Sequence, residues 1–133
     1  MKHYFNDTIF STSNQTTSSI KIIRISGKNS HEISKIFNFK QPTPRTFELK
    51  RLTYKSKLID IAPVIWLPDK KSYTGENTYE LYIHGSVIIE KIIYEILNSH
   101  KNFRTAEPGE FTKRAYLNGK LDLLQAESIN DII

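Results

Sequence analysis

Three segments of the chain carry side chains that could bind a charged or polar ligand, and the first contains Arg24. This arginine lies within the β-branched run Ile20–Ile25, where an extended backbone would place it on one face with Ile20 and Ile22. A partly buried guanidinium needs an anionic partner, because an unpaired buried charge is costly. That partner is either a carboxylate of the chain or a bound anion, and the residues alone leave both open.

The second segment, Thr78–His84, alternates between apolar and polar residues, which predicts a strand with one polar face. Glu80, Tyr82 and His84 share that face, opposite Tyr79, Leu81 and Ile83. A carboxylate, a phenol and an imidazole together suit the floor of a polar pocket. A solvated outer sheet face has the same composition, so the pattern is compatible with either role.

The third segment runs from Glu107 to Leu123. Pro108 suits the first turn of a helix, and Asn118-Gly119 suits its left-handed end. Within this helix, Lys113-Arg114 is interpreted as a solvated face. Lys120 follows at the junction, where it faces either solvent or an anion.

The elements that must position these segments follow from periodicity and from turn-forming residues. Pro63 within the third predicted strand indicates an edge or a bulge, and the polar stretch Ser11–Ser19 indicates a surface loop. Ser30 is expected to cap a short helix that buries Ile33, Ile36 and Phe37 on one face. Strands are expected at Ile20–Ile25, Thr46–Tyr54, Leu58–Leu67 and Thr78–His84, and the clearest amphipathic helix at Val87–Leu97. This order predicts an α+β fold with a mixed, mostly antiparallel sheet and three to four helices.

A last helix is expected after Asp122, which forms a capping-box pattern with Gln125. Its apolar positions Leu124, Ile129, Ile132 and Ile133 continue to the final residue, with no stop signal. We therefore expect the chain to end inside a helix, as a piece of a longer protein would.

Composition narrows the class of protein. The 133 residues suffice for one domain, contain no cysteine, and include no run of the roughly 20 apolar residues that a membrane span needs. We expect a cytoplasmic protein without disulfides or a secretory signal. The net charge of +5 is compatible with an anionic partner. The basic residues are scattered along the chain, which favours a lysine-rich composition as the explanation of the charge. Their densest run is Lys50, Arg51, Lys55 and Lys57.

Several catalytic patterns are missing from the sequence. It has no G-x-x-x-x-G-K-[ST] phosphate loop and no G-x-G-x-x-G, so GTP or a dinucleotide has no familiar site in this chain. His3, His31, His84 and His100 lack the spacing of metal ligands, and we expect neither a metal site nor catalytic residues here.

At the three segments the sequence resembles the MnmE or TrmE family of tRNA-modification GTPases. The matching stretches are Asp7-Thr8-Ile9, Arg24-Ile25-Ser26-Gly27, Ser72-Tyr73-Thr74-Gly75-Glu76, His84-Gly85 and the run from Glu107 to Ile133. The resemblance implies a fold like the folate-binding domain of glycine-cleavage aminomethyltransferases. It divides the chain into a folate-binding and dimerisation domain, 1–119, and the start of a helical domain, 120–133, with the GTP-binding domain absent.

The resemblance also implies a function. Family members form homodimers through this domain and bind 5-formyl- or 5,10-methylene-tetrahydrofolate, with contacts that fall on Arg24, Glu80 and Lys120. With a flavin-dependent partner of the MnmG or GidA type they modify C5 of the wobble uridine of tRNA. GTP hydrolysis, with Mg²⁺ and K⁺, belongs to the GTP-binding domain, so this chain alone is expected to be non-catalytic.

Two departures from the family pattern keep alternatives open. Ser11–Ser19 replaces a loop rich in Pro and Gly that carries an Arg, while Ser86 and Asn77 replace a Gly and an Asp. A structural dimerisation module with a decayed folate site is therefore one alternative. The net charge of +5 raises another, a basic tRNA-binding module. A standalone one-carbon transferase has no nucleophile or base constellation to support it.

Overall fold

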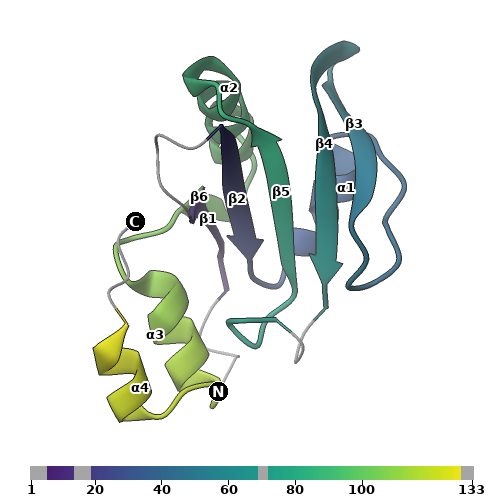
Figure 1. The fold of residues 1–133 in the computed structure, drawn as a ribbon. Helices are drawn as coiled ribbons and strands as arrows, with labels where there is room; N and C mark the ends of the chain where they lie inside the picture. Colours follow the sequence, from purple (N-terminus) through teal and green to yellow (C-terminus); the bar gives the residue numbers. More distant parts are fainter. Residues whose placement is uncertain (1–5, 14–18, 69–71, 130–133) are drawn as a thin grey trace.

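The sheet of this protein has six strands in the order β3-β4-β5-β2-β1-β6 (Figure 1). The structure, a computed structural model, describes residues 6–13, 19–68 and 72–129. All neighbouring strands are antiparallel except β1 and β6, which are parallel. The strands are β1 (Thr8–Thr12), β2 (Ile20–Ser26), β3 (Glu48–Tyr54), β4 (Lys57–Leu67), β5 (Thr78–His84) and β6 (Phe103–Thr105).

Two helices cover one face of the sheet, and two lie at the end near β1 (Figure 1). The covering helices are α1 (Ile33–Ile36), preceded by the 3₁₀ helix η2 (Ser30–Glu32), and α2 (Val87–Asn98). The others are α3 (Glu110–Leu117) and α4 (Leu123–Ser128). The predicted α+β class is confirmed. None of the helices formed by the described residues has the length and apolarity to cross a membrane.

The core lies between the sheet and helices α1 and α2. Alternate residues of β2 and β5 point into it, and Ile23, Ile25, Leu81 and Ile83 are completely buried there. Burial of each such side chain contributes about 1.5–3 kcal/mol. A slip of one residue would turn the whole set to the opposite face, so the hydrophobic pattern sets the register of the central strands.

The opposite face of the sheet, here called the outer face, is only partly covered. At the β1 end, Phe111 of α3 packs against Ile9 in a small second core. At the β3–β4 end, Phe47, Leu49 and Ile61 stay exposed. Residues in the middle of β2 and β5 therefore lie at the border between a covered and an uncovered half.

Strands β1 and β6 were not predicted from the sequence. In β1, Ile9 and Phe10 are both completely buried, one on each face, so the strand lacks the alternation that reveals a half-exposed strand. Strand β6 has three residues, too few to show a period. The surface-loop prediction for Ser11–Ser19 is wrong at its start, since Ser11 and Thr12 belong to β1, and residues 14–18 lie outside the described residues.

The prediction of an edge or a bulge in the strand that contains Pro63 is confirmed in part. Strand β4 lies inside the sheet, but Pro63 falls outside its ladder with β5. The register with β3 shifts where Leu52 faces Asp60 and Thr53 faces Leu58, which leaves Ile59 of β4 as the extra residue. The proline is accommodated because β4 pairs with β5 only over Val64–Leu67. Beyond that ladder the Asp60 carboxylate accepts the backbone N–H of His84 at 2.9 Å, so a side chain replaces the missing strand bond.

Helix ends were predicted within a few residues. Helix α3 begins at Glu110 rather than Pro108, because Gly109 precedes it with a left-handed φ of 78°. Ser30 is the first residue of η2 and does not cap it; its hydroxyl donates to the backbone carbonyls of Gly27 and Asn77.

The predicted capping box of the last helix is present. The Asp122 side chain accepts from the Gln125 N–H, and the Gln125 side chain accepts from the Asp122 N–H. Helix α4 ends at Ser128, however, and Ile129 is extended. The expected continuation of the helix is thus wrong at Ile129, and Ile132 and Ile133 lie outside the described residues.

Candidate functional site

Arg24 and Glu80 form an ion pair in the middle of the outer face. They are direct cross-strand partners in the β2–β5 ladder, so antiparallel pairing places both on the same side. Arg24 Nε donates to Glu80 Oε2 at 3.1 Å, with 21% of the arginine and 14% of the glutamate side chain exposed. The predicted anionic partner of Arg24 is therefore Glu80, and both groups remain reachable from solvent.

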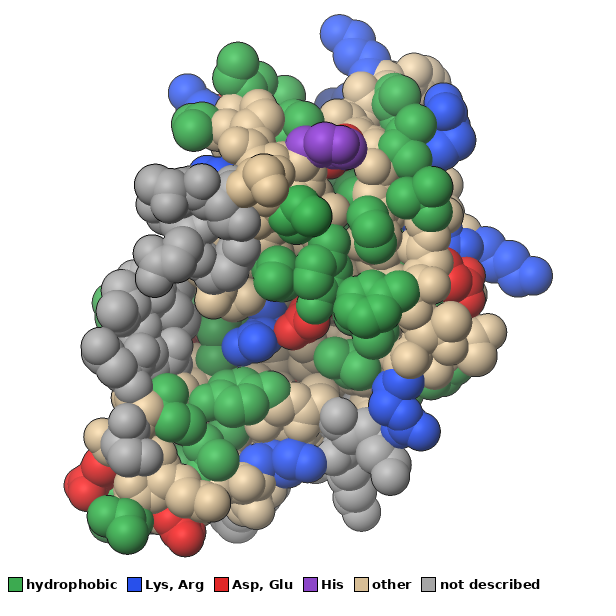
Figure 2. Space-filling view, in the orientation of Figure 1, with side chains coloured by type: hydrophobic (Ala, Val, Ile, Leu, Met, Phe, Trp, Pro, Cys, Tyr) green, Lys and Arg blue, Asp and Glu red, His purple; other side chains and the backbone are tan. Residues whose placement is uncertain are grey.

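Two aromatic rings flank the guanidinium of Arg24. Its Cζ lies 5.1 Å from the ring centroid of Tyr73 and 5.2 Å from that of Phe111. Cation–π attraction over such distances favours this placement of the arginine. Tyr73 comes from the loop before β5 and Phe111 from α3, so three separate parts of the chain build the site. In Figure 2 a basic and an acidic side chain lie together in the middle of this face, with hydrophobic side chains above and below them.

Tyr82 supplies a second donor to Glu80. Its hydroxyl donates to Oε1 of Glu80 at 2.9 Å. Burial, together with this hydrogen bond to Glu80, raises the pKa of Tyr82 to about 12, so the phenol remains protonated at neutral pH. Each oxygen of Glu80 thus accepts one hydrogen bond from these two side chains. A carboxylate oxygen has two lone pairs, so Glu80 has the capacity to accept from a ligand as well.

Lys120 lies on a neighbouring turn. Its stem packs against Gly75, where an added Cβ would lie 3.2 Å from Lys120 Cγ and 3.0 Å from Asn118 Cβ. Gly75 also has a φ of 80°, a left-handed conformation that favours glycine. Asn118 Nδ2 donates to the Thr74 carbonyl at 2.9 Å, which fastens the same turn to the loop. The structure therefore brings Arg24 and Glu80 into contact and places Lys120 beside the loop that carries Tyr73.

His84 is separated from this group although its strand parity is the same as that of Glu80. Its Nδ1 lies 2.8 Å from Asp60 Oδ1, and 72% of its side chain is exposed. The predicted polar face is thus split between a Glu80–Tyr82 pair and a His84–Asp60 pair. Over the described residues, 6–13, 19–68 and 72–129, no group of three or more His, Asp and Glu side chains could hold a metal ion.

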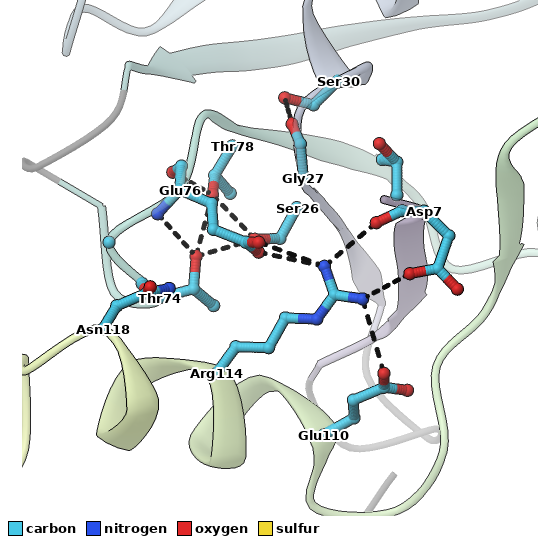
Figure 3. A network of polar contacts seen from close by, with 12 residues as sticks. Asp7, Ser26, Gly27, Ser30, Thr74, Glu76, Thr78, Glu110, Arg114 and Asn118 are labelled. Carbon is cyan, nitrogen blue, oxygen red and sulfur yellow. Dashed lines mark hydrogen bonds and ion pairs between the residues drawn. The ribbon is translucent and has the colours of Figure 1, made fainter. Parts of the chain in front are cut away.

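A buried ion network lies beneath the aromatic side of the site (Figure 3). At its centre is Arg114 of α3, whose side chain is completely buried. Its Nη1 lies 3.2 Å from both carboxylate oxygens of Glu76, and its Nη2 donates to Asp7 Oδ1 at 2.9 Å. Glu110 Oε2 lies 3.5 Å from the same Nη2. One guanidinium therefore joins the N-terminal segment, the loop before β5 and helix α3.

The interpretation of Lys113-Arg114 as a solvated helix face is wrong for Arg114 and correct for Lys113, which is exposed. The helical spacing of Arg114 from its apolar neighbours indicates that it is buried. Phe111, Arg114 and Ala115 lie at positions i, i+3 and i+4, which is one face of a helix, and all three are buried. The acidic partners could not be read from the sequence, since Asp7 is 107 residues away.

Arg104 extends the network at its solvent side. It donates to Asp7 and to both oxygens of Glu110. Burial alone raises the pKa of Glu110, but hydrogen bonds from Arg104 and the Glu107 N–H outweigh it, and the pKa lies below the ordinary 4.5. The pKa of Asp7 is likewise lowered, because the two arginines outweigh the effect of burial. Both carboxylates therefore remain charged at neutral pH.

A separate hollow of about 490 Å³ lies between the β3–β4 hairpin and α2. Its walls are largely apolar, with Leu58, Ile92 and Ile96 among them, and Lys55 and Glu95 belong to its lining. It is distant in the fold from the Arg24–Glu80 pair. We take the pair, not the hollow, as the candidate site, because the pair offers convergent donors and acceptors that could orient a polar ligand.

Comparison with known proteins connects this geometry to a family. Residues 8–120 match the family described as GTP-binding protein TrmE N-terminus. A tRNA modification GTPase MnmE of Buchnera aphidicola subsp. Baizongia pistaciae is 46% identical over 132 residues, covering 97% of this chain and 29% of that protein. The MnmE of Pelagibacter ubique is 42% identical over 119 residues, covering 87% of this chain and 27% of that protein.

A less similar relative matches nearly the same length of the chain. The MnmE of Mycoplasmopsis pulmonis is 38% identical over 129 residues, covering 96% of this chain and 29% of its own length. The chain thus spans less than a third of each of these three relatives. The match covers both strands of the Arg24–Glu80 pair, the loop with Tyr73 and helix α3. The chain belongs to the TrmE N-terminal family, the N-terminal domain of tRNA-modification GTPases.

Proposed function

We propose that this chain is the folate-binding and dimerisation domain of a GTPase that modifies C5 of the wobble uridine of tRNA. Family membership supports the connection to tRNA modification, since the relatives carry the name tRNA modification GTPase MnmE. The single observation that carries the folate proposal is the Glu80 carboxylate, paired with an arginine that lies against two aromatic rings.

The proposed ligand is 5-formyl- or 5,10-methylene-tetrahydrofolate. A reduced pterin presents a ring N–H beside an exocyclic NH₂, and one carboxylate can accept both in a bidentate arrangement. Glu80 is the group suited to this role. The aromatic side chains that flank Arg24 offer apolar contact for a flat heterocycle. Arg24 and Lys120 are cations suited to the formyl oxygen or the tail carboxylates.

The uncovered half of the outer face supports a second part of the proposal, a homodimer. Phe47, Leu49 and Ile61 are 57%, 68% and 39% exposed, and they adjoin the candidate site on the same face. Another copy of the chain is the proposed occupant, and it would place the folate near or across the boundary between protomers. The assignment of 1–119 to this unit and 120–133 to the start of a helical domain stays a prediction.

The remaining activities are proposed for the longer protein. GTP, Mg²⁺ and K⁺ would be bound by a separate GTP-binding domain, because this sequence contains no phosphate-loop motif. A flavin-dependent partner of the MnmG or GidA type and tRNA complete the proposed assembly in the cytoplasm. This chain would contribute folate binding and dimerisation rather than catalysis.

Calorimetric titration with 5-formyltetrahydrofolate tests the folate proposal, and a parallel titration with 5,10-methylene-tetrahydrofolate distinguishes the two forms. We expect saturable binding that falls at least about tenfold, or about 1.4 kcal/mol, in Glu80→Ala. Glu95→Ala, which removes an exposed carboxylate from α2, is the matched control and should bind normally. Absence of binding to the parent chain would favour a dimerisation module with a decayed site, and equal affinity in Glu80→Ala would contradict the role proposed for Glu80.

Sedimentation velocity tests the dimer. We expect a dimer whose association is weakened in Leu49→Glu, because a charge placed on an interface core is desolvated without a partner. Val87→Glu, on an equally exposed residue of α2, is the control and should leave association unchanged. A monomer at all concentrations, with or without folate, would contradict this part of the proposal.

A further inference from the structure

The aromatic rings beside Arg24 come from a loop and a helix that the buried ion network joins, and both rings also belong to or pack against the small core around Ile9 of β1. Tyr73 belongs to the loop Ser72–Asn77, and its hydroxyl lies 2.9 Å from Thr112 Oγ1 of α3. Phe111 is the residue before Thr112. Figure 3 shows the polar contacts that fasten this loop and helix α3 to each other and to the sheet. The positions of the two rings follow from those of the loop and the helix.

Glu76 is the point at which this fastening meets the strands. Its Oε1 accepts a hydrogen bond from Ser26 Oγ at 2.8 Å, and Ser26 is two residues after Arg24 on the same face of β2. Ser26 Oγ also lies 2.7 Å from Thr74 Oγ1 within the loop. A chain of short contacts thus runs from β2 through Glu76 to Arg114, and along α3 to Phe111.

Charge explains why Arg114 is essential to this arrangement. The network brings together three carboxylates, those of Asp7, Glu76 and Glu110, and two guanidiniums, those of Arg104 and Arg114. Glu76 is 6% exposed and forms an ion pair with Arg114. Without that guanidinium a buried carboxylate would remain unneutralised beside two others, and repulsion would separate the loop from the helix.

We propose that Arg114 and Glu76 are positioning residues of the folate site: their ion pair places Tyr73 and Phe111 against Arg24. This inference rests on the proposed folate function, but its geometric part concerns Arg24 and its two rings alone. Neither Arg114 nor Glu76 touches the ligand in this role. Their effect on affinity acts through the orientation of Arg24.

The test compares Arg114→Met with the neutral double variant Glu76→Gln/Arg114→Met and with a control that breaks another buried ion pair. Lys21 and Glu90 provide this control, since they form a 2.8 Å ion pair between β2 and α2, on the opposite side of the sheet. Lys21→Met/Glu90→Gln should lower the melting temperature without disturbing the site. All titrations are made well below the melting temperature of each variant, with folding verified by circular dichroism.

Two readouts separate positioning from general stability. The first is the ¹H–¹⁵N resonance of Arg24 Nε, whose proton experiences the ring currents of Tyr73 and Phe111. The second is the affinity for 5-formyltetrahydrofolate. In Arg114→Met we expect the Arg24 resonance to move towards that of an arginine without aromatic neighbours, and the affinity to fall at least tenfold. In the Lys21/Glu90 control the resonance should stay in place and the affinity should change less than twofold.

The conservative variant Arg114→Lys keeps the charge but loses the planar fork that contacts Glu76 and Asp7 together. It should fold and show a smaller change in both readouts than Arg114→Met. If Arg114→Met does not fold, the double variant, which removes both charges, and Arg114→Lys decide the question by the same readouts.

An unmoved Arg24 resonance in the folded Arg114 variants, or equal losses of affinity in the Lys21/Glu90 control, would overturn the positioning role. If the parent chain binds no folate, the proposed function fails. The resonance alone then decides whether Arg114 positions Arg24.

Discussion

Arg24 and Arg114 lie in the same region of the molecule and are embedded in different ways. Arg114 is completely buried, contacts two carboxylates and a backbone carbonyl closely, and approaches a third carboxylate. Arg24 is 21% exposed, donates to one carboxylate from Nε, and otherwise lies against two rings. The first environment fixes a guanidinium as part of the scaffold. The second leaves donors and an acceptor with capacity for a ligand.

The largest loss of stability is expected in Arg114→Met. Removal of one partner from a buried ion pair leaves an uncompensated charge and costs about 3–5 kcal/mol. Urea unfolding followed by circular dichroism should show this loss in the free energy of unfolding. The double variant Glu76→Gln/Arg114→Met should recover part of it, because both charges are then removed. A loss below about 1 kcal/mol in Arg114→Met would mean that the network is not a scaffold.

Gly75 lies in the loop between Tyr73, which contacts Arg24, and Glu76, which pairs with Arg114. Its substitution should cause the next largest loss of stability. In Gly75→Ala the left-handed backbone costs about 1–2 kcal/mol, and the new Cβ would also meet Asn118 Cβ at 3.0 Å. Gly119→Ala is the matched control, because its φ of 76° is similar and an added Cβ meets nothing within 4 Å. Unfolding experiments should show a larger loss for Gly75→Ala than for Gly119→Ala. Equal losses would show that the turn with Lys120 is not packed against the loop.

Lowering the pH should remove the stability that the Asp7 and Glu110 carboxylates contribute to the buried ion network. The pKa values of Asp7 and Glu110 lie below their ordinary values of 3.8 and 4.5, despite the opposing effect of burial. Their contribution to stability is therefore complete above those ordinary values and is lost as the pH falls through the folded-state values. Melting temperatures should be level between about pH 5.5 and 7 and decline below about pH 4.5.

Arg104→Met should flatten this decline, because the hydrogen bonds from Arg104 contribute most to lowering the pKa values of Asp7 and Glu110. An equally steep decline in Arg104→Met would assign the acid sensitivity to other carboxylates. Glu90 is the first to consider, since Lys21 and Thr12 lower its pKa against the effect of burial.

The smallest effect on stability is expected at the candidate site itself. Arg24→Met should cost no more than about 1 kcal/mol in urea unfolding, because a partly exposed ion pair contributes little. The same variant should nevertheless lower the affinity for 5-formyltetrahydrofolate markedly in calorimetry. If Arg24→Met destabilised the fold as strongly as Arg114→Met, the distinction between scaffold and site would be lost.

Much of the central fold could be predicted from the sequence. The β-branched run of β2, the alternation of β5 and the apolar period of α2 each specify a half-buried element, and the structure confirms all three. The capping box at Asp122 was equally readable, because it depends on residues three positions apart. Parity also placed Glu80 on the polar face of its strand, and Arg24 on one face with Ile20 and Ile22. Local patterns were sufficient wherever one face of an element is buried and the other is not.

Only the tertiary structure decided which residues meet. The register of β2 against β5 sets Arg24 opposite Glu80, and the packing of α3 on the outer face brings in Phe111. Arg114 shows the limit most clearly. Its helical spacing predicts a buried face, but a buried guanidinium is stable only beside carboxylates, and one of these lies 107 residues away. The sequence alone predicted the central elements and proposed the candidate ligand-binding residues, whereas the tertiary structure decided which charged side chains pair across long stretches of the chain.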